Sequence, residues 1–130
     1  MIIQLTRLRR ADLPFQYKQG VPIEVAPFAY AKLLQNVHRL GSVKAVLRMA
    51  KAKAGPVVTD NGNFVIDAPF EESLYQDPFT LLSHLKMLTG VVEVGLFCGM
   101  TKAAYFGNQV SLTLRIVIRT NLVIGRWRHG

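Results

Sequence analysis

The chain has 130 residues, half of them apolar and 18% charged, which is typical of one folded domain and excludes an intrinsically disordered protein. Its net charge of +8 lies at the two ends: residues 1–20 carry four bases against one acid, and residues 109–130 carry four bases and no acid. Residues 21–108 are almost neutral, so the composition does not predict a folded surface that binds a phosphate backbone.

The sequence shows no targeting or membrane segment. No apolar run approaches the ~20 residues that a membrane-spanning helix needs. Residues 1–5 form too short an apolar run for a secretory signal, and no small-residue cleavage site follows them. Cys98 is the single cysteine, which excludes an intrachain disulfide. These features favour a reducing, cytoplasmic location.

Two stretches at the start of the central region predict a strand followed by a helix. Residues 21–25 alternate apolar and polar side chains, as a half-buried strand does. Residues 29–40 place apolar side chains at helical spacing, and Gly41 stands where a C-terminal cap glycine belongs. The apolar stripe of this helix comprises Tyr30, Leu33, Leu34, Val37 and Leu40. Residues 43–49 then predict a second strand.

The dipeptide Asn61-Gly62 predicts a β-hairpin between residues 57–60 and 63–67. A type I′ turn needs positive φ at both central residues, and asparagine followed by glycine meets that need.

Asp77 and Pro78 predict the start of a second helix, because aspartate accepts hydrogen bonds from the free amides and proline at the first helical position loses none. The apolar stripe of this helix comprises Leu81, Leu82, Leu85 and Leu88. Gly90 is expected to end it, and residues 91–97 predict another strand. One face of that strand holds Val92, Val94 and Leu96.

The predicted order from residue 21 to residue 97 is β-α-β-β-α-β, with a β-hairpin arm in the middle. This order predicts an α/β (α+β) fold of the ferredoxin-like kind, with an antiparallel sheet and both helices on one side. Residues 1–19 show no clear period. The tail alternates over residues 111–119 as a strand does, and residues 122–124 add further apolar surface.

Three sequence blocks carry a resemblance to a known family. Residues 54–67 read AGPVVTDNGNFVID and resemble the GPVVTDNGNF block of type A ribose-5-phosphate isomerases, particularly the animal enzymes. Residues 21–30, VPIEVAPFAY, are similar to the family's P-(I/V)-E-V-x-P-x-A segment. Residues 89–97, TGVVEVGLF, are similar to its (P/T)-G-V-V-x-x-G-L-F segment. Because the blocks follow the family order, residues 21–108 are identified as the family's C-terminal part.

The resemblance implies an enzyme that interconverts ribose 5-phosphate and ribulose 5-phosphate in the non-oxidative pentose phosphate pathway, without a metal or other cofactor. It implies that residues 21–108 form the smaller, ferredoxin-like lid domain, without the N-terminal Rossmann-like catalytic domain. The family's enzymes are usually dimers or tetramers. Residues 1–20 and the basic tail, residues 109–130, depart from the family pattern and are interpreted as divergent segments.

The family's catalytic motifs are absent from these 130 residues. They are a phosphate loop, a DGADE-type acidic block and a K-G-G-G block that holds the general base. Isomerisation through an enediolate needs a base, stabilisation of an oxyanion and an anchor for the phosphate. The family's substrate-contacting lysine should fall near residues 9–11, where the sequence reads Arg9-Arg10-Ala11. The chain alone is therefore expected to be inactive, and no residue receives a catalytic role.

The histidines and the cysteine have structural interpretations. His38 and His84 lie on or beside the polar faces of the two predicted helices, which is typical of exposed surface histidines, and His129 lies in the tail. Their spacing matches no metal motif. Cys98 follows an apolar strand and has no basic neighbour closer than Lys102, so a buried inert thiol is favoured over a nucleophile.

Four residues are candidates for substrate binding. Lys51 and Lys53 would face a phosphate across an interdomain cleft, with a solvated loop as the alternative. Asp60 and Asn61 gather polar groups in a turn together with Gly62 and Asn63. The alternative is turn formation by asparagine and glycine and capping of a local amide by Asp60. The acidic pair at residues 71–72 has no paired-carboxylate geometry and is interpreted as solubilising.

Two functions remain open. As an isomerase lid, the chain would bind a sugar phosphate only in the company of a catalytic domain, and would pack against a full-length isomerase subunit or form a homo-oligomer. As a non-catalytic interaction module, it would bind acidic partners or RNA through its basic ends. Trp127 is the only obvious stacking platform in the basic tail, which argues against specific nucleic-acid binding.

Overall fold

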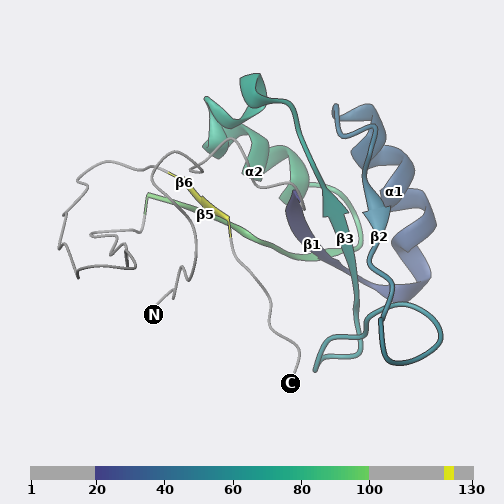
Figure 1. Cartoon of the computed structure of the whole chain (residues 1–130). Coiled ribbons are helices and arrows are strands. Elements are labelled where there is room, and N and C mark those ends of the chain that lie inside the picture. Colours follow the sequence, from purple (N-terminus) through teal and green to yellow (C-terminus); the bar gives the residue numbers. More distant parts are fainter. Residues whose placement is uncertain (1–19, 100–121, 125–130) are drawn as a thin grey trace, which may run out of the picture.

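The structure is a computed structural model that describes residues 20–99 and 122–124 of the chain. These residues form a four-stranded antiparallel sheet, two α-helices and a two-stranded ribbon (Figure 1). The elements are β1 (Val21–Val25), the 3-10 turn η2 (Pro27–Ala29), α1 (Tyr30–Arg39), β2 (Val46–Leu47), β3 (Phe64–Ala68), the 3-10 turn η3 (Glu72–Tyr75), α2 (Pro78–Lys86), β4 (Val91–Val94), β5 (Leu96–Cys98) and β6 (Leu122–Ile124). The predicted mixed α/β architecture is confirmed.

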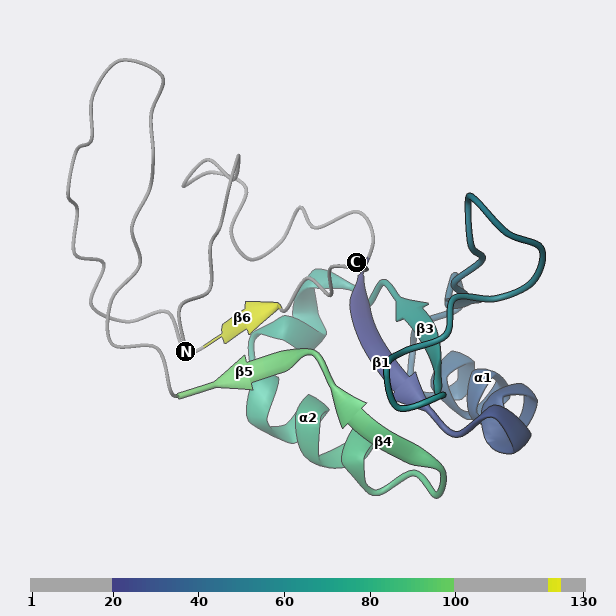
Figure 2. The same cartoon turned by 90° about the horizontal axis from the view of Figure 1, so that it is seen from below.

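The sheet has the strand order β2-β3-β1-β4, and every neighbouring pair is antiparallel. β1 and β3 pair along their whole lengths, from Val21 opposite Ala68 to Val25 opposite Phe64. Helix α1 packs beside β2 and β3, and helix α2 packs beside β4 and β5 (Figure 1). In Figure 2 the β5–β6 ribbon extends from the end of β4.

One apolar core lies between the sheet and both helices. Alternate residues of β1 enter it, because side chains along a strand point to opposite faces. The fully buried apolar members include Val21, Ile23, Val25, Leu33, Val37, Ile66, Leu85 and Val94. Since α1 and α2 both contribute to this cluster, they cover the same face of β1. Among the described residues no helix covers the other face, which is called the helix-free face below.

Helix α1 matches its predicted stripe. Leu33 and Val37 are buried, and Leu34 and Leu40 pack against the core from its margin. Tyr30 lies at the edge of the stripe, where its ring meets the ring of Phe64 edge-on with centroids 5.8 Å apart.

The chain turns sharply after α1 before it enters β2. Gly41 has φ +108°, as expected of a residue that follows a helix end. The buried Ser42 then donates its hydroxyl to the carbonyl of Pro69 at 2.8 Å, and the amide of Ala45 donates to the carbonyl of Ser42. This turn explains why β2 covers only Val46–Leu47 rather than the predicted residues 43–49.

Helix α2 begins where the sequence predicts. Asp77 caps it by accepting hydrogen bonds from the amide of Thr80 at 3.1 Å and from the Thr80 hydroxyl at 2.6 Å. Pro78 occupies the first helical position, and Leu81 and Leu85 are buried below it. The Thr80 hydrogen bonds lower the pKa of Asp77 below its ordinary value of 3.8.

The Asp77 cap gives a testable dependence of stability on pH. Its pKa is lower in the folded chain than in the unfolded chain, so its contribution is fully present above pH ~4 and is lost as the pH falls through the lowered pKa. Replacing Asp77 with asparagine is expected to remove this part of the acid sensitivity. Urea midpoints measured from pH 2 to pH 6 check the difference, and parallel curves for the two proteins would contradict the expectation.

The last predicted strand is divided. β4 ends at Val94, and β5 begins at Leu96 and pairs with β6, with Leu96 opposite Ile124. A bulge also interrupts β4, because Glu24 pairs with Glu93 whereas Val25 pairs with Val91. The extra residue changes the alternation, so Val92 is 50% exposed while Val94 and Leu96 are buried. The prediction that these three side chains share one face is therefore wrong for Val92.

The remaining predictions for the ends of the chain fall on residues that the structure does not describe. The predicted strand at residues 111–119, the basic ends and Trp127 lie outside the described residues. Within the described part, no helix is long and apolar enough to cross a membrane.

Candidate functional site

Polar side chains gather on the helix-free face around Glu24. This residue lies in the middle of β1, yet only 4% of its surface is exposed. Its Oε1 accepts a hydrogen bond from the Thr59 hydroxyl at 2.7 Å and another from the Asn63 side-chain amide at 3.0 Å. The carboxylate therefore ties the 59–63 turn to the central strand pair.

The 59–63 turn closes a β-hairpin, as predicted, but through a different turn. The amide of Thr59 donates to the carbonyl of Asn63, and the amide of Gly62 donates to the carbonyl of Thr59, both at 2.8 Å. The loop thus has three residues, 60–62, and Gly62 takes the left-handed conformation at φ +78°. The prediction of a two-residue type I′ turn is therefore wrong, because Asp60 belongs to the loop and not to the strand before it. The arm is also short, with a single bridge between Val58 and Phe64 before β3 continues.

An ion pair between Arg48 and Asp67 also lies on the helix-free face. Arg48 follows β2, and its Nε donates to Asp67 Oδ2 at 2.9 Å while its Nη2 donates to Oδ1 at 2.5 Å. Both side chains are mostly buried, with 13% and 10% of their surfaces exposed. The backbone of Arg48 also joins two segments, because its amide donates to Val65 and its carbonyl accepts from Val57. Arg48 therefore adds backbone and side-chain contacts to β3 directly after the two paired residues of β2.

Replacing Arg48 with lysine is expected to lower the free energy of unfolding by about 1.5 kcal/mol. A lysine offers one ammonium to Asp67 in place of the two-pronged guanidinium. Urea unfolding followed by circular dichroism measures the loss. The matched control is Arg39 to lysine, at an exposed position of α1, which is expected to change the stability by less than about 0.5 kcal/mol. Equal losses in the two variants would contradict the role of the ion pair.

The four predicted substrate-binding residues lie on two exposed loops. Lys51 and Lys53 lie between the bridged residues Met49 and Pro56. Asp60 and Asn61 lie at the tip of the hairpin, and the local amide of the turn, that of Asn63, is bonded to Thr59 Oγ1 at 3.1 Å rather than to Asp60. No hydrogen bond in the described part brings the lysines and the turn together. A role of these residues in substrate binding stays a prediction.

Glu24, Thr59 and Arg48 were not singled out by the sequence. The Glu24–Thr59 contact spans 35 positions, so no local pattern reveals it. The one available signal is a glutamate inside an apolar strand segment, VPIEV, all five residues of which are buried.

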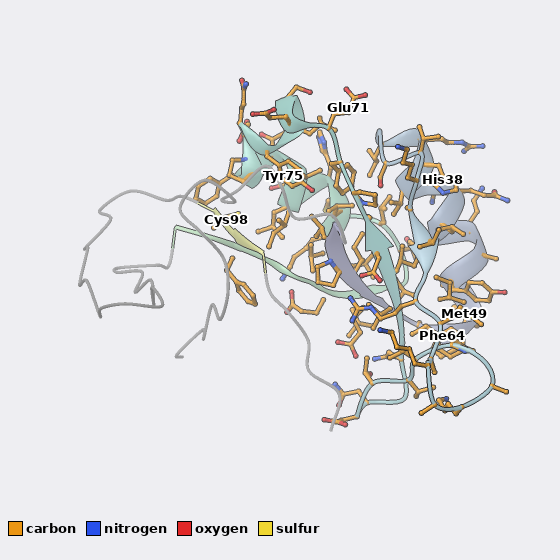
Figure 3. All side chains as sticks on the ribbon, in the orientation of Figure 1. His38, Met49, Phe64, Glu71, Tyr75 and Cys98 are labelled. Atoms are coloured by element: carbon orange, nitrogen blue, oxygen red, sulfur yellow. The ribbon has the colours of Figure 1, made fainter. Side chains whose placement is uncertain are left out.

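The two described histidines differ in their exposure. His38 is half-buried rather than exposed, because its Nε2 lies 2.9 Å from the carbonyl of Ala45, to which it donates. His84 is exposed, as predicted, and His129 lies outside the described residues. Figure 3 shows Cys98 well separated from His38. No His–Cys arrangement for nucleophilic catalysis forms between them.

Cys98 has the surroundings of an inert thiol. Its sulfur is half-buried and donates weakly to the carbonyl of Pro78 at 3.5 Å. Burial, followed by the nearby charge of Asp77, raises the pKa of the thiol. A raised pKa disfavours the reactive thiolate. In the described part, no three His, Cys, Asp or Glu side chains lie close enough to hold a metal ion.

Solved structures of similar fold share one activity in their names. Ribose 5-phosphate isomerase A from Methanocaldococcus jannaschii matches with a TM-score of 0.68 and 31% identity, over 78% of this chain and 43% of that one. A D-ribose-5-phosphate isomerase in complex with phospho-erythronic acid matches with a TM-score of 0.52 and 41% identity, over 61% of this chain and 33% of that one. The fold is thus that of one portion of a sugar-phosphate isomerase.

The sequence comparison defines the family. The chain belongs to the ribose 5-phosphate isomerase A (phosphoriboisomerase A) family, whose sequence model matches residues 2–111. The ribose-5-phosphate isomerase of Mycosarcoma maydis is 67% identical over 103 residues, which are 79% of this chain and 36% of the relative. That of Dictyostelium discoideum is 52% identical over 97 residues, which are 74% of this chain and 41% of the relative. The chain therefore spans about a third of the length of its curated relatives.

Proposed function

We propose that these 130 residues are the lid portion of a type A ribose-5-phosphate isomerase and have no isomerase activity by themselves. In this proposal the chain acts in the cytoplasm, on or beside a ribose 5-phosphate site that a catalytic portion supplies. The observation that carries the proposal is the combination of family membership with a match to only 36% of the first relative.

The use of the acidic residues supports the absence of catalysis. Glu24 is bonded to Thr59 and Asn63, and Asp67 is paired with Arg48. Glu93 is paired with Lys86 of α2. Asp77 caps α2. The remaining described acids, Asp60, Glu71 and Glu72, are exposed. A general base has to stand within hydrogen-bond reach of a bound substrate carbon, and no described carboxylate is free and held at such a place.

The topology supports the assignment to the lid. The elements follow the order β1-α1-β2-β3-α2-β4, and the sheet order is β2-β3-β1-β4 with β1 in the interior. This is the arrangement of a ferredoxin-like βαββαβ unit. We infer that residues 21–108 correspond to the family's ferredoxin-like domain, with residues 1–20 and 109–130 outside it.

Isomerase activity of the purified 130-residue chain tests the proposal. Ribose 5-phosphate is supplied, and ribulose 5-phosphate is measured beside a full-length isomerase as the positive control. Folded protein, judged by circular dichroism, is expected to give no turnover above the uncatalysed rate. Turnover by the 130-residue chain would mean that a base is present within it and would refute the proposal.

Association with a catalytic portion is the second consequence. A full-length isomerase subunit is expected to retain the tagged chain at micromolar concentration, because a lid has evolved to pack against such a portion. The Kd is measured by sedimentation, with an unrelated basic protein of similar size as the control. Equal binding to the control, or none to the isomerase, would contradict a lid that still recognises its enzyme.

A further inference from the structure

The tip of the hairpin carries the only asparagine–glycine step in the 130 residues, Asn61-Gly62. Both residues are exposed, and Gly62 has φ +78°. An asparagine side chain loses ammonia most readily when glycine follows it, because no Cβ atom hinders the approach of the next backbone nitrogen to the side-chain carbonyl. The 59–63 turn therefore presents a step that is prone to deamidation on an accessible loop.

Deamidation at this step consumes water and releases ammonia. The amide nitrogen of Gly62 gives its proton to solvent hydroxide and bonds to the side-chain carbonyl carbon of Asn61. The bond from that carbon to the side-chain nitrogen breaks, and the nitrogen takes a proton from water and leaves as ammonia. One water then opens the resulting succinimide. Cleavage at the side-chain carbonyl leaves aspartate, and cleavage at the backbone carbonyl leaves isoaspartate, so no oxidant or cofactor is needed.

The folded turn restrains the attacking nitrogen. The amide of Gly62 donates to the carbonyl of Thr59 at 2.8 Å, so its proton is engaged while the turn is closed. Thr59 is fixed in turn, because its hydroxyl donates to Glu24 Oε1 at 2.7 Å and accepts from the amide of Asn63 at 3.1 Å. Glu24 is buried in the central strand β1. The attack therefore has to wait until the turn opens.

Asn63 provides a comparison within the same turn. Its side-chain amide donates to Glu24 Oε1 at 3.0 Å, and the bulky Phe64 follows it. Within the described part, no hydrogen bond holds the side chain of Asn61. Of the two turn asparagines, Asn61 thus has the freer side chain and the less hindered neighbour.

We propose that Asn61 is a site of spontaneous deamidation and that the bond between Thr59 and Glu24 sets its rate by keeping the turn closed. The product places a new carboxylate beside Asp60. Isoaspartate also lengthens the main chain by one carbon, inside a loop that the bond from Gly62 to Thr59 closes. The modification is irreversible without a repair enzyme and marks aged copies of the chain. The proposal does not depend on isomerase activity.

Mass spectrometry of the folded 130-residue chain, incubated at neutral pH, tests the site. Trypsin releases a peptide that begins at Ala54, and its fragment masses separate a change at Asn61 from one at Asn63. Methylation by an isoaspartate-specific methyltransferase detects the isoaspartate form, and chain digested without incubation gives the background. We expect the change at Asn61 and none at that position in Asn61→Gln, since glutamine has to close a larger ring. An unchanged Asn61, or reaction at Asn63 instead, would overturn the site.

A matched pair of variants tests the control by the turn. Thr59→Val removes the hydroxyl that bonds to Glu24, and Thr80→Val removes a hydroxyl that bonds to Asp77 at 2.6 Å at the start of α2. Thr59→Val is expected to deamidate about tenfold faster than the wild type, because the loss of a hydrogen bond to a charged group raises the open fraction of the turn by about that factor. Thr80→Val is expected to react at the wild-type rate. Equal rates in the two variants would overturn the role of the turn.

Low concentrations of urea separate opening of the turn from unfolding of the whole chain. Opening the turn exposes little surface, so the wild-type rate is expected to change little below the unfolding transition. Circular dichroism has to show that each variant is folded under the conditions of the incubation. A rate that rises with urea as steeply as the unfolded fraction does would mean that Asn61 reacts only in the unfolded chain, and would overturn control by the Thr59–Glu24 bond.

Discussion

Replacing Glu24 with alanine is expected to lower the free energy of unfolding by about 3 kcal/mol. Only 4% of the surface of Glu24 is exposed, and one oxygen of its carboxylate accepts two hydrogen bonds. Its removal leaves the Thr59 hydroxyl and the Asn63 side-chain amide without their acceptor. Hydrogen bonds to charged groups contribute about 1.5–3 kcal/mol each, and an unsatisfied donor adds its own cost.

Urea unfolding measures this loss, and a double-mutant cycle identifies its cause. Glu72 to alanine is the control, because it removes an exposed glutamate and is expected to change the stability by less than about 0.5 kcal/mol. Asn63 to alanine is expected to cost less in the Glu24 variant than in the wild type, by about 1 kcal/mol. Strict additivity of the two substitutions would show that the bond between their side chains contributes nothing.

Replacing Gly20 with alanine is expected to destabilise the chain by about 3 kcal/mol, the sum of two separate costs. Gly20 has φ +79°, which is unfavourable for any residue with a Cβ. A Cβ atom there would also lie 2.2 Å from the amide nitrogen of Pro69 and 2.3 Å from the carbonyl carbon of Ala68. These are backbone atoms at the end of β3, so no side chain can move aside to relieve the overlap.

Gly62 supplies the matched control for Gly20. It has almost the same backbone conformation, φ +78°, but a Cβ atom there would meet nothing within 4 Å. Gly62 to alanine is expected to cost only the conformational part, about 1–2 kcal/mol. The difference between the two losses measures the close approach of the entry to β1 and the end of β3. Equal losses in the two variants would mean that the entry to β1 and the end of β3 lie farther apart than in the structure.

The helices were predictable because local chemistry decides them. The stripe at Leu33 and Val37 and the cap at Asp77 need only near neighbours in sequence. The presence of the strands was also predictable. Their exact bounds and bulges depend on the neighbouring strands with which they pair. The bulge in β4 and the break at Gly95 arise where β4 meets β1, and neither follows from the alternation of residues 91–97.

The polar contacts of the helix-free face could not be predicted from the sequence, because they too depend on partners that lie far apart along the chain. Glu24 alternates with apolar neighbours, so its position predicts an exposed side chain on a half-buried strand. Its burial comes from a turn 35 residues away, which folds onto the open side of the sheet. Of the polar turn residues predicted from the sequence, Asn63 makes one of these contacts, whereas Asp60 and Asn61 make neither. The other contact is made by Thr59, which was not predicted.

The exposed loop that carries Lys51 and Lys53 separates the strands of the sheet into two groups along the chain. It is closed by the bond from the amide of Ala50 to the carbonyl of Gly55, and a Cβ atom at Gly55 would meet nothing within 4 Å. β1, α1 and β2 precede the loop, and β3, α2 and β4 follow it. The pairs β1–β3, β1–β4 and β2–β3 all cross this division. A tryptic cut at either lysine would therefore yield two complementary fragments held together by every ladder of the sheet, and the loop is a natural point for splitting the chain or inserting a reporter.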